Sequence, residues 1–220
     1  MQAVDQTHQA FGYETDFWAL SERMNIPVIQ GEYNSSLVLP GQIPQPLITL
    51  RPEVYHGQWS FTRFHELAHA VLRDSGIETQ LRHEADEPEQ FRAWVEAYCN
   101  FGAAQLQIPN PELRRVLSRW GYSPEAVVAL ARVEGVDLFD AMHRVAFGFL
   151  EDDAQRTVLL IQGRYIRKCV TTTWFPHLEG QRLPKPSVSY PSARILRLPA
   201  RFGWSRVLSV LNGKSDEIWE

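Results

Sequence analysis

The stretch FTRFHELAHAVLRDSG, residues 61–76, places the strongest constraint on the fold of this chain. Its apolar side chains recur at the three- and four-residue spacing of one helix face, which predicts a helix over about residues 59–73. The buried stripe of this helix is formed by Phe61, Phe64, Ala68, Val71 and Leu72. His65 and His69 are four residues apart, so they share a face of the same helix. One side of the helix is therefore apolar, and another carries two imidazoles.

The pattern H-E-x-x-H, formed by His65, Glu66 and His69, combines groups that suit metal-assisted hydrolysis. The two histidines can bind one divalent ion, because residues at i and i+4 point the same way. Glu66 is one position further round the helix, where a carboxylate reaches bound water and acts as a general base. The alternative is a surface helix with two solvated histidines, since the short pattern also arises by chance.

Such a site needs a third protein ligand. Glu96 is a candidate, because it lies in a second amphipathic helix predicted over residues 91–109, among apolar neighbours where an unpaired carboxylate is costly. Asn100 follows four residues later on the same face and can orient a ligand histidine. The alternative for Glu96 is an exposed charge on the polar side of its helix. Other possible donors in the polar link between the two helices are Asp74, His83, Glu84, Glu87 and Glu89.

Three blocks of sequence, residues 59–76, 95–109 and 127–145, resemble the ImmA/IrrE family of metallopeptidases. In that family the H-E-x-x-H helix is followed by a block of the form E-x-x-x-N-x-F-A-x-x-L-L-x-P. Here the interval from His65 to Glu96 is 31 residues. The chain departs mildly from the family pattern, with Phe101-Gly102 in place of Phe-Ala and Gln107-Ile108 in place of Leu-Met.

The resemblance implies a zinc ion held by His65, His69 and Glu96, with Glu66 as the catalytic base. Two histidines and one carboxylate also tolerate other divalent ions such as Mn²⁺. The resemblance further implies an endopeptidase in the cytosol that cleaves a helix-turn-helix transcriptional repressor and so derepresses genes under stress. The alternative function is a regulatory binding module that keeps a structural metal and docks a repressor or DNA without proteolysis.

A peptidase also stabilises the oxyanion that develops on the cleaved carbonyl. Possible donors for this role are Tyr98, His143 and Arg144. The alternative for each is a packed or solvated side chain, and the sequence does not rank them.

The charge of the chain is divided unequally. From Gln155 to Glu220 there are 11 Lys and Arg against 4 Asp and Glu, a balance of +7. Because the whole chain has a net charge of −4, the residues before Gln155 carry −11. This asymmetry predicts two units. We expect a metallopeptidase domain over 1–153, including a helix-turn-helix-like segment at about 111–150, and a basic unit over 154–220.

The expected fold class is α+β, with a zincin-like core made of a small sheet and active-site helices. Short apolar runs bounded by Pro and Gly predict the strands of that sheet, within residues 26–33, 35–41 and 46–52. Helical segments are predicted at about 111–119, 123–133 and 137–149. The C-terminal unit is expected to mix strands and loops and to end in a short helix over 201–214.

The basic C-terminal unit interleaves arginines with aromatic residues, which allows direct binding of nucleic acid. Docking of an acidic protein, or a solvated basic face, is the favoured interpretation. No apolar run reaches the ~18 residues of a membrane span, and the N-terminus lacks the features of a signal peptide. Two cysteines, Cys99 and Cys169, fit a reducing compartment. We therefore expect a soluble cytoplasmic protein without a membrane partner.

Overall fold

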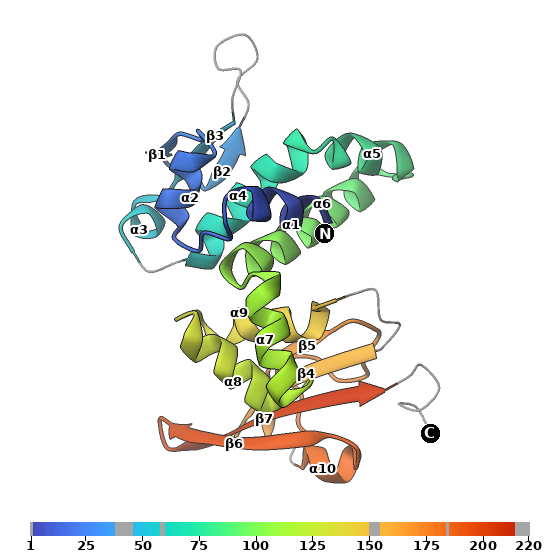
Figure 1. Ribbon diagram of the computed structural model, residues 1–220. Helices are drawn as coiled ribbons and strands as arrows, with labels where there is room; N and C mark the ends of the chain where they lie inside the picture. Colours follow the sequence, from blue (N-terminus) through green and yellow to red (C-terminus); the bar gives the residue numbers. More distant parts are fainter. Residues whose placement is uncertain (1, 38–45, 58–59, 150–154, 184, 214–220) are drawn as a thin grey trace. The chain divides into compact units, whose positions relative to one another are not determined.

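Two separate sheets organise the chain in the computed structural model (Figure 1). The structure describes residues 2–37, 46–57, 60–149, 155–183 and 185–213. The chain divides into two units, Met1–Asn110 and Pro111–Glu220, and each contains one of the sheets. Helices and strands occur in both units, which confirms the predicted α+β class. Among the described residues, no helix combines the length and the apolar character needed to cross a bilayer.

The sheet of the first unit has three short strands. They are β1 (Val28–Gln30), β2 (Ser35–Leu37) and β3 (Leu47–Leu50), in the order β1-β3-β2. β1 runs parallel to β3, and β2 pairs antiparallel with β3 at the edge. All three lie within the predicted apolar runs, although residues 38–41 of the second run lie outside the described part of the chain.

Six helices of the first unit lie in its described residues. They are α1 (Gln2–Ala10), α2 (Phe17–Arg23), α3 (Pro52–Tyr55), α4 (Ser60–Asp74), α5 (Ile77–Glu84) and α6 (Pro88–Gln107). α4 is the predicted motif helix, and its stripe is buried at Phe64, Ala68, Val71 and Leu72. α6 begins three residues before the predicted start, because Pro88 is well suited to the first turn of a helix.

The two long helices α4 and α6 pack closely against each other in the core of this unit. Gly102 of α6 lies against Ala68 of α4, and a Cβ atom at Gly102 would lie 2.8 Å from the Ala68 Cβ. The missing side chain therefore permits the close approach. Gln107, near the end of α6, also donates a hydrogen bond of 2.7 Å from Nε2 to Ser60 Oγ at the start of α4.

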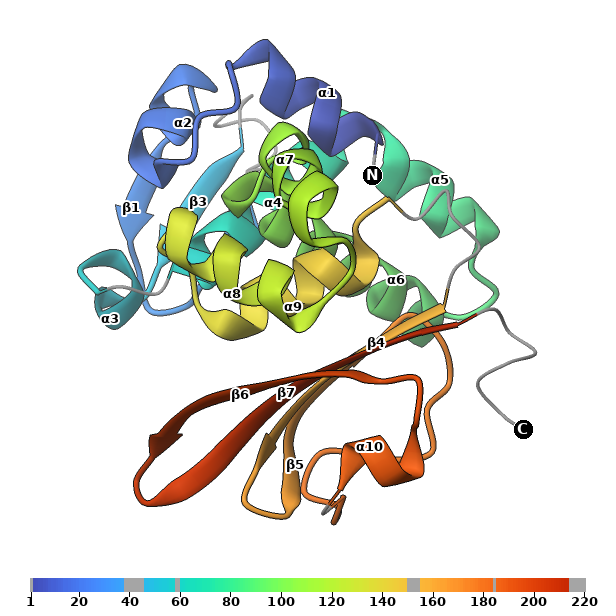
Figure 2. The same ribbon diagram turned by 60° about the horizontal axis from the view of Figure 1, so that its bottom comes forward.

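The described residues of the second unit combine three longer helices and one short helix with a four-stranded antiparallel sheet. Its main helices are α7 (Asn110–Trp120), α8 (Pro124–Val133) and α9 (Leu138–Phe147), close to the predicted segments. The strands are β4 (Gln155–Gln162), β5 (Tyr165–Thr171), β6 (Arg194–Arg201) and β7 (Trp204–Gly213), in the order β5-β4-β7-β6. Figure 2 shows α8 and α9 on one face of this sheet and the short helix α10 (Pro186–Ser189) on the other.

The junction between the units falls earlier than the expected position after residue 153. The helical segment belongs with the basic strands, because several contacts tie it to them. The buried guanidinium of Arg156 on β4 lies over the Tyr122 ring and donates to the Gly148 carbonyl at 2.7 Å. Arg194 on β6 also pairs with Glu125 on α8 at 3.5 Å. The change in composition near Asp153 marks the change from helices to strands within one unit.

The predicted terminal helix over 201–214 is wrong, since this segment forms the turn after β6 and the strand β7. Leu208, Val210 and Leu211 are buried there, and their spacing fits a helix as well as a strand buried on both faces. β7 pairs with β4 on one side and β6 on the other, so tertiary pairing decides the conformation. Asn212 does not end a helix but donates a hydrogen bond of 2.9 Å to the Tyr122 carbonyl.

Candidate metal centre

Three side chains with metal-binding atoms come together on α4 and α6. His65 and His69 lie on α4, and Glu96 lies on α6. One ligand atom from each lies within 4.8 Å of the others, so the group could hold a metal ion. The two Nε2 atoms are 3.2 Å apart, and the Glu96 oxygens lie 3.2 Å from His65 Nε2 and 3.6 Å from His69 Nε2. We call this group the His–His–Glu cluster.

The separations within the His–His–Glu cluster fit a divalent ion. A tetrahedral ion with nitrogen and oxygen ligands at about 2.0–2.2 Å holds neighbouring ligand atoms about 3.3–3.6 Å apart. The observed distances of 3.2 to 3.6 Å agree with this geometry without rearrangement of the helices. The donor set suits zinc and several other divalent ions, so it fits a metal without selecting one.

The orientation of His65 is set by Asn100. His65 Nδ1 lies 3.0 Å from Asn100 Oδ1, and an amide oxygen only accepts, so Nδ1 carries the proton. The lone pair of the imidazole then lies on Nε2, which faces the cluster. The predicted contact between Asn100 and His65 is thus present, while its role in metal binding stays a prediction.

The two histidines are more buried than the carboxylate. Their side chains are 16% and 19% exposed, whereas the Glu96 side chain is 58% exposed. The apolar surroundings expected for Glu96 are therefore wrong, and its carboxylate reaches the histidines from an open side. Burial lowers the pKa of His69, and the neighbouring His65 lowers it further. A low pKa favours the neutral imidazole, which is the form that binds a metal.

Glu66 is buried beside the cluster without being part of it. The residue is 7% exposed, and burial raises the pKa of its carboxyl to about 7, with the nearby Glu96 charge adding to the effect. A hydrogen bond from the backbone N–H of Ser36 acts in the opposite direction. Arg73 Nη2 donates to the Ser36 carbonyl at 3.1 Å. Ser36 therefore links the edge strand β2 to the motif helix α4 through both its N–H and its carbonyl group.

The other candidate ligands do not join the cluster. Among the described His, Cys, Asp and Glu residues, only His65, His69 and Glu96 form such a group. Glu89 instead pairs with Arg92 at 2.7 Å, and Glu84 accepts a hydrogen bond from Gln80.

The candidate oxyanion donors lie in different surroundings. Tyr98 is partly buried on α6 and packs against the core of the first unit. His143 lies on α9 between the rings of Phe139 and Phe147, and burial lowers its pKa to about 4. Arg144 is buried on the same helix. The assignment of any of these three to an oxyanion stays a prediction.

Sequence reasoning missed the role of Ser36. Its contact with Glu66 uses the main chain, and every non-proline residue carries the same N–H group. The signal that could have found it is the position of β2 at an edge of the small sheet, where N–H groups are free to bond outside the sheet.

Comparison with curated proteins gives two related matches. The chain is 31% identical over 83 residues to a radiation response metalloprotease, IrrE, of Deinococcus radiodurans, which is 38% of this chain and 25% of that protein. It is also 31% identical over 101 residues to IrrE of Deinococcus deserti, covering 46% of this chain and 36% of the relative. These matches support an ImmA/IrrE-type family. The chain spans about a quarter to a third of the length of these relatives.

Two further comparisons, with family models and with solved structures, add information on the fold only. No protein family model matches the chain. A solved structure, described as a Mycobacterium tuberculosis transcriptional regulator, superposes with a TM-score of 0.57 and 14% identity over 97% of this chain and 74% of that one. The architecture is thus shared along nearly the whole chain. The ImmA/IrrE-type resemblance therefore rests on partial sequence similarity and on the three motif blocks.

Proposed function

We propose that the protein is a metal-dependent endopeptidase. The observation that carries the proposal is the His–His–Glu cluster, together with the buried Glu66 carboxylate that lies next to it on α4 but is not one of its ligands. A structural metal site has no need of a base beside it and is usually closed by a fourth protein ligand. Here the three ligands leave one side open, where Glu96 is exposed to solvent.

The chemistry follows from the positions of the residues. His65, His69 and Glu96 would hold a divalent ion, zinc in our proposal, which would supply Lewis acidity toward a peptide carbonyl and a water molecule. Glu66 takes a proton as the water oxygen attacks the carbonyl carbon, and returns it to the amine when the C–N bond breaks. The Ser36 N–H holds the carboxylate in place, and Asn100 fixes the His65 ring.

For the substrate we propose a regulatory protein of the helix-turn-helix repressor class, cleaved at a specific bond in the cytoplasm. This part rests on the family resemblance and on relatives that are named for a radiation response. The outcome would be derepression of genes under stress. A binding module with a purely structural metal predicts the same ion but no cleavage.

Metal content and cleavage are tested together. Elemental analysis of untagged protein should give about one zinc per chain, and Glu96→Ala should lower this occupancy. Cleavage of a co-expressed repressor should require the metal and should stop with Glu66→Gln, which keeps the ion. Absence of metal after zinc addition would contradict the metal centre. Metal retention with an unchanged biological effect in Glu66→Gln would instead favour the binding module.

A further inference from the structure

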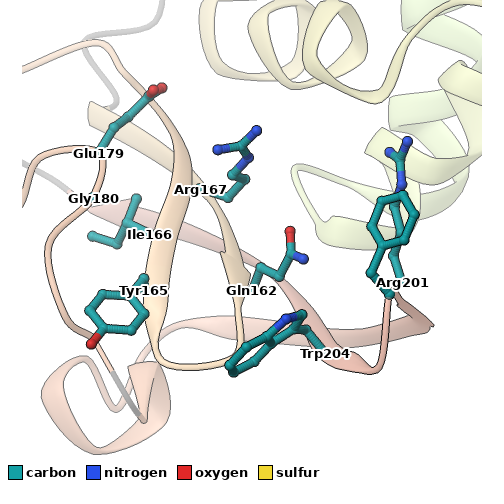
Figure 3. A pocket seen from close by; sticks show the side chains of 9 residues that line it. Gln162, Tyr165, Ile166, Arg167, Glu179, Gly180, Arg201 and Trp204 are labelled. Carbon is teal, nitrogen blue, oxygen red and sulfur yellow. The ribbon is translucent and has the colours of Figure 1, made fainter.

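A pocket of about 760 Å³ lies where both hairpins of the second sheet turn (Figure 3). The β4–β5 hairpin turns at residues 163–164, and the β6–β7 hairpin turns at residues 202–203. The Gly163 N–H donates to the Ser205 carbonyl at 2.8 Å and joins the two turns. We call this feature the twin-hairpin pocket. It is lined by residues of the second unit only.

Two arginines and one glutamate, Glu179, line the twin-hairpin pocket, and the segment that builds it is strongly basic. Residues 155–213 contain ten Lys and Arg and a single acidic residue, Glu179, which pairs with Lys168 at 3.6 Å. Arg167 and Arg201 line the pocket, and Figure 3 shows their guanidinium groups pointing to the same side. An adjoining pocket shares Trp204 and is lined by the cations Arg164, Arg182 and Lys185. Within the described part of the chain, none of these five cations has an ion-pair partner.

Large aromatic rings lie exposed beside these cations. Tyr165, Phe202 and Trp204 line the pocket and are 54%, 83% and 57% exposed. The Trp204 ring packs over Gly163, where a Cβ atom would lie 2.8 Å from Trp204 Cε3. Gly163, with φ of +64°, therefore leaves room for the indole ring to pack directly on its backbone. Flat, supported rings beside guanidinium groups form a platform for stacking of another ring.

The turn that carries Phe202 departs from local preference. Phe202 has φ of +52° and Gly203 has φ of +74°, so both central residues are left-handed. Two-residue turns of this kind favour Asn-Gly, because other side chains are strained at the first position. A phenylalanine there costs conformational free energy and gains no burial. Departures of this type occur at functional positions, which points to use of the exposed ring.

We propose that the twin-hairpin pocket binds nucleotides, with a base stacked on the exposed ring of Phe202 and phosphate oxygens paired with Arg167 and Arg201. The volume is in the range of small-ligand sites. An acidic peptide would satisfy the cations but would leave the rings unused, so the nucleotide is favoured. The adjoining cations extend the basic surface beyond one nucleotide, which favours a single strand of nucleic acid over a free nucleotide.

Fluorescence anisotropy of the full chain with a labelled oligothymidylate of about 12 nucleotides tests the proposal. Binding should weaken steeply between about 50 and 200 mM salt, since phosphate contacts release counterions. A parallel titration with uridine monophosphate distinguishes binding of a free nucleotide from binding of a nucleic-acid strand. Displacement of the oligonucleotide by similar concentrations of the monophosphate would assign a free nucleotide, and weak displacement would assign a strand.

Variants connect binding to the pocket. Phe202→Gly removes the ring and also the left-handed strain, so it should weaken binding about tenfold without lowering the melting temperature. Arg201→Gln should weaken binding and reduce the salt dependence by about one phosphate contact. Arg197→Gln is the matched control, because Arg197 is exposed on the same strand and lines neither pocket.

Several results would overturn the proposal. These are no binding of either nucleotide probe, equal losses from Arg197→Gln and Arg201→Gln, or full binding by Phe202→Gly. Tighter binding of hexaglutamate than of the oligonucleotide would assign the surface to an acidic protein instead. None of these measurements depends on peptidase activity, so the inference stands or fails independently of the proposed function.

Discussion

The candidate functional groups of the first unit are carried by long packed helices, and those of the second by hairpin turns. In the His–His–Glu cluster the two histidines are mostly buried, and the Asn100 side chain fixes the His65 ring. In the twin-hairpin pocket the rings and guanidinium groups are largely exposed. The first arrangement suits chemistry that requires fixed distances, and the second suits a ligand that brings its own shape and charge.

The largest expected effect is the loss of cleavage on removal of the buried base. Glu66→Gln should reduce the cleavage rate by about 10²–10⁴-fold, because the amide cannot take a proton from water. Metal content and melting temperature should remain close to those of the unchanged protein. Glu89→Gln is a matched control, since Glu89 is 74% exposed on α6 and pairs only with Arg92 among the described residues. Normal cleavage by Glu66→Gln would contradict the assignment of the base.

In the second unit, the free energy of unfolding should depend on pH because of the buried His143. The pKa of His143 is lowered to about 4, mainly by burial and also by the charge of Lys168, while Glu179 acts in the opposite direction. The unfolded chain therefore binds more protons between pH 6.5 and 4, so stability is full above pH 6.5 and falls as the pH decreases to 4. The loss attributable to this group is about 3 kcal/mol.

Urea unfolding of the unchanged protein and of His143→Leu over this pH range measures the difference. Lys168 and Glu179 stay in place in the variant, so the comparison isolates the imidazole. Its unfolding free energy should fall less steeply with acid. Parallel pH profiles of the two proteins would show that His143 is protonated equally in the folded and unfolded states.

A smaller effect is expected from the residue that orients His65. Asn100→Ala should weaken metal binding by about 10–100-fold, because the imidazole loses the acceptor that fixes its tautomer. Competition with a chromophoric chelator gives the affinity. Gln80→Ala removes a similar amide from an exposed position on α5 and should leave the affinity unchanged. Equal affinities of Asn100→Ala and the unchanged protein would remove Asn100 from the metal centre.

The smallest effect concerns helix packing. Gly102→Ala should improve helix propensity by about 1 kcal/mol but place a methyl group 2.8 Å from the Ala68 Cβ. Since overpacking costs about 1–3 kcal/mol, the net change should be a lower melting temperature. Ala93→Gly on the exposed side of α6 measures the propensity term alone. A higher melting temperature for Gly102→Ala would mean that α4 and α6 separate without cost.

The sequence predicted α4 and α6 well because their apolar spacing is long and regular, but it did not predict α5, which lies in the polar link between them. The helix with His65 and His69, and the contact of Asn100 with His65, followed from i and i+4 geometry. Pattern alone could not distinguish helix from strand over the short apolar run near Val210, because pairing with distant strands decides it. The exposure of Glu96 also depended on tertiary packing.

The backbone hydrogen bond from Ser36 to Glu66 has a consequence for the divergence of related sequences. Any residue except proline supplies the same N–H group, so drift at this position leaves the contact intact. A column of aligned sequences would therefore look unconstrained at a place where the geometry is fixed. A scan that substitutes alanine would pass over it as well, and only proline would reveal that the carboxylate depends on this peptide group.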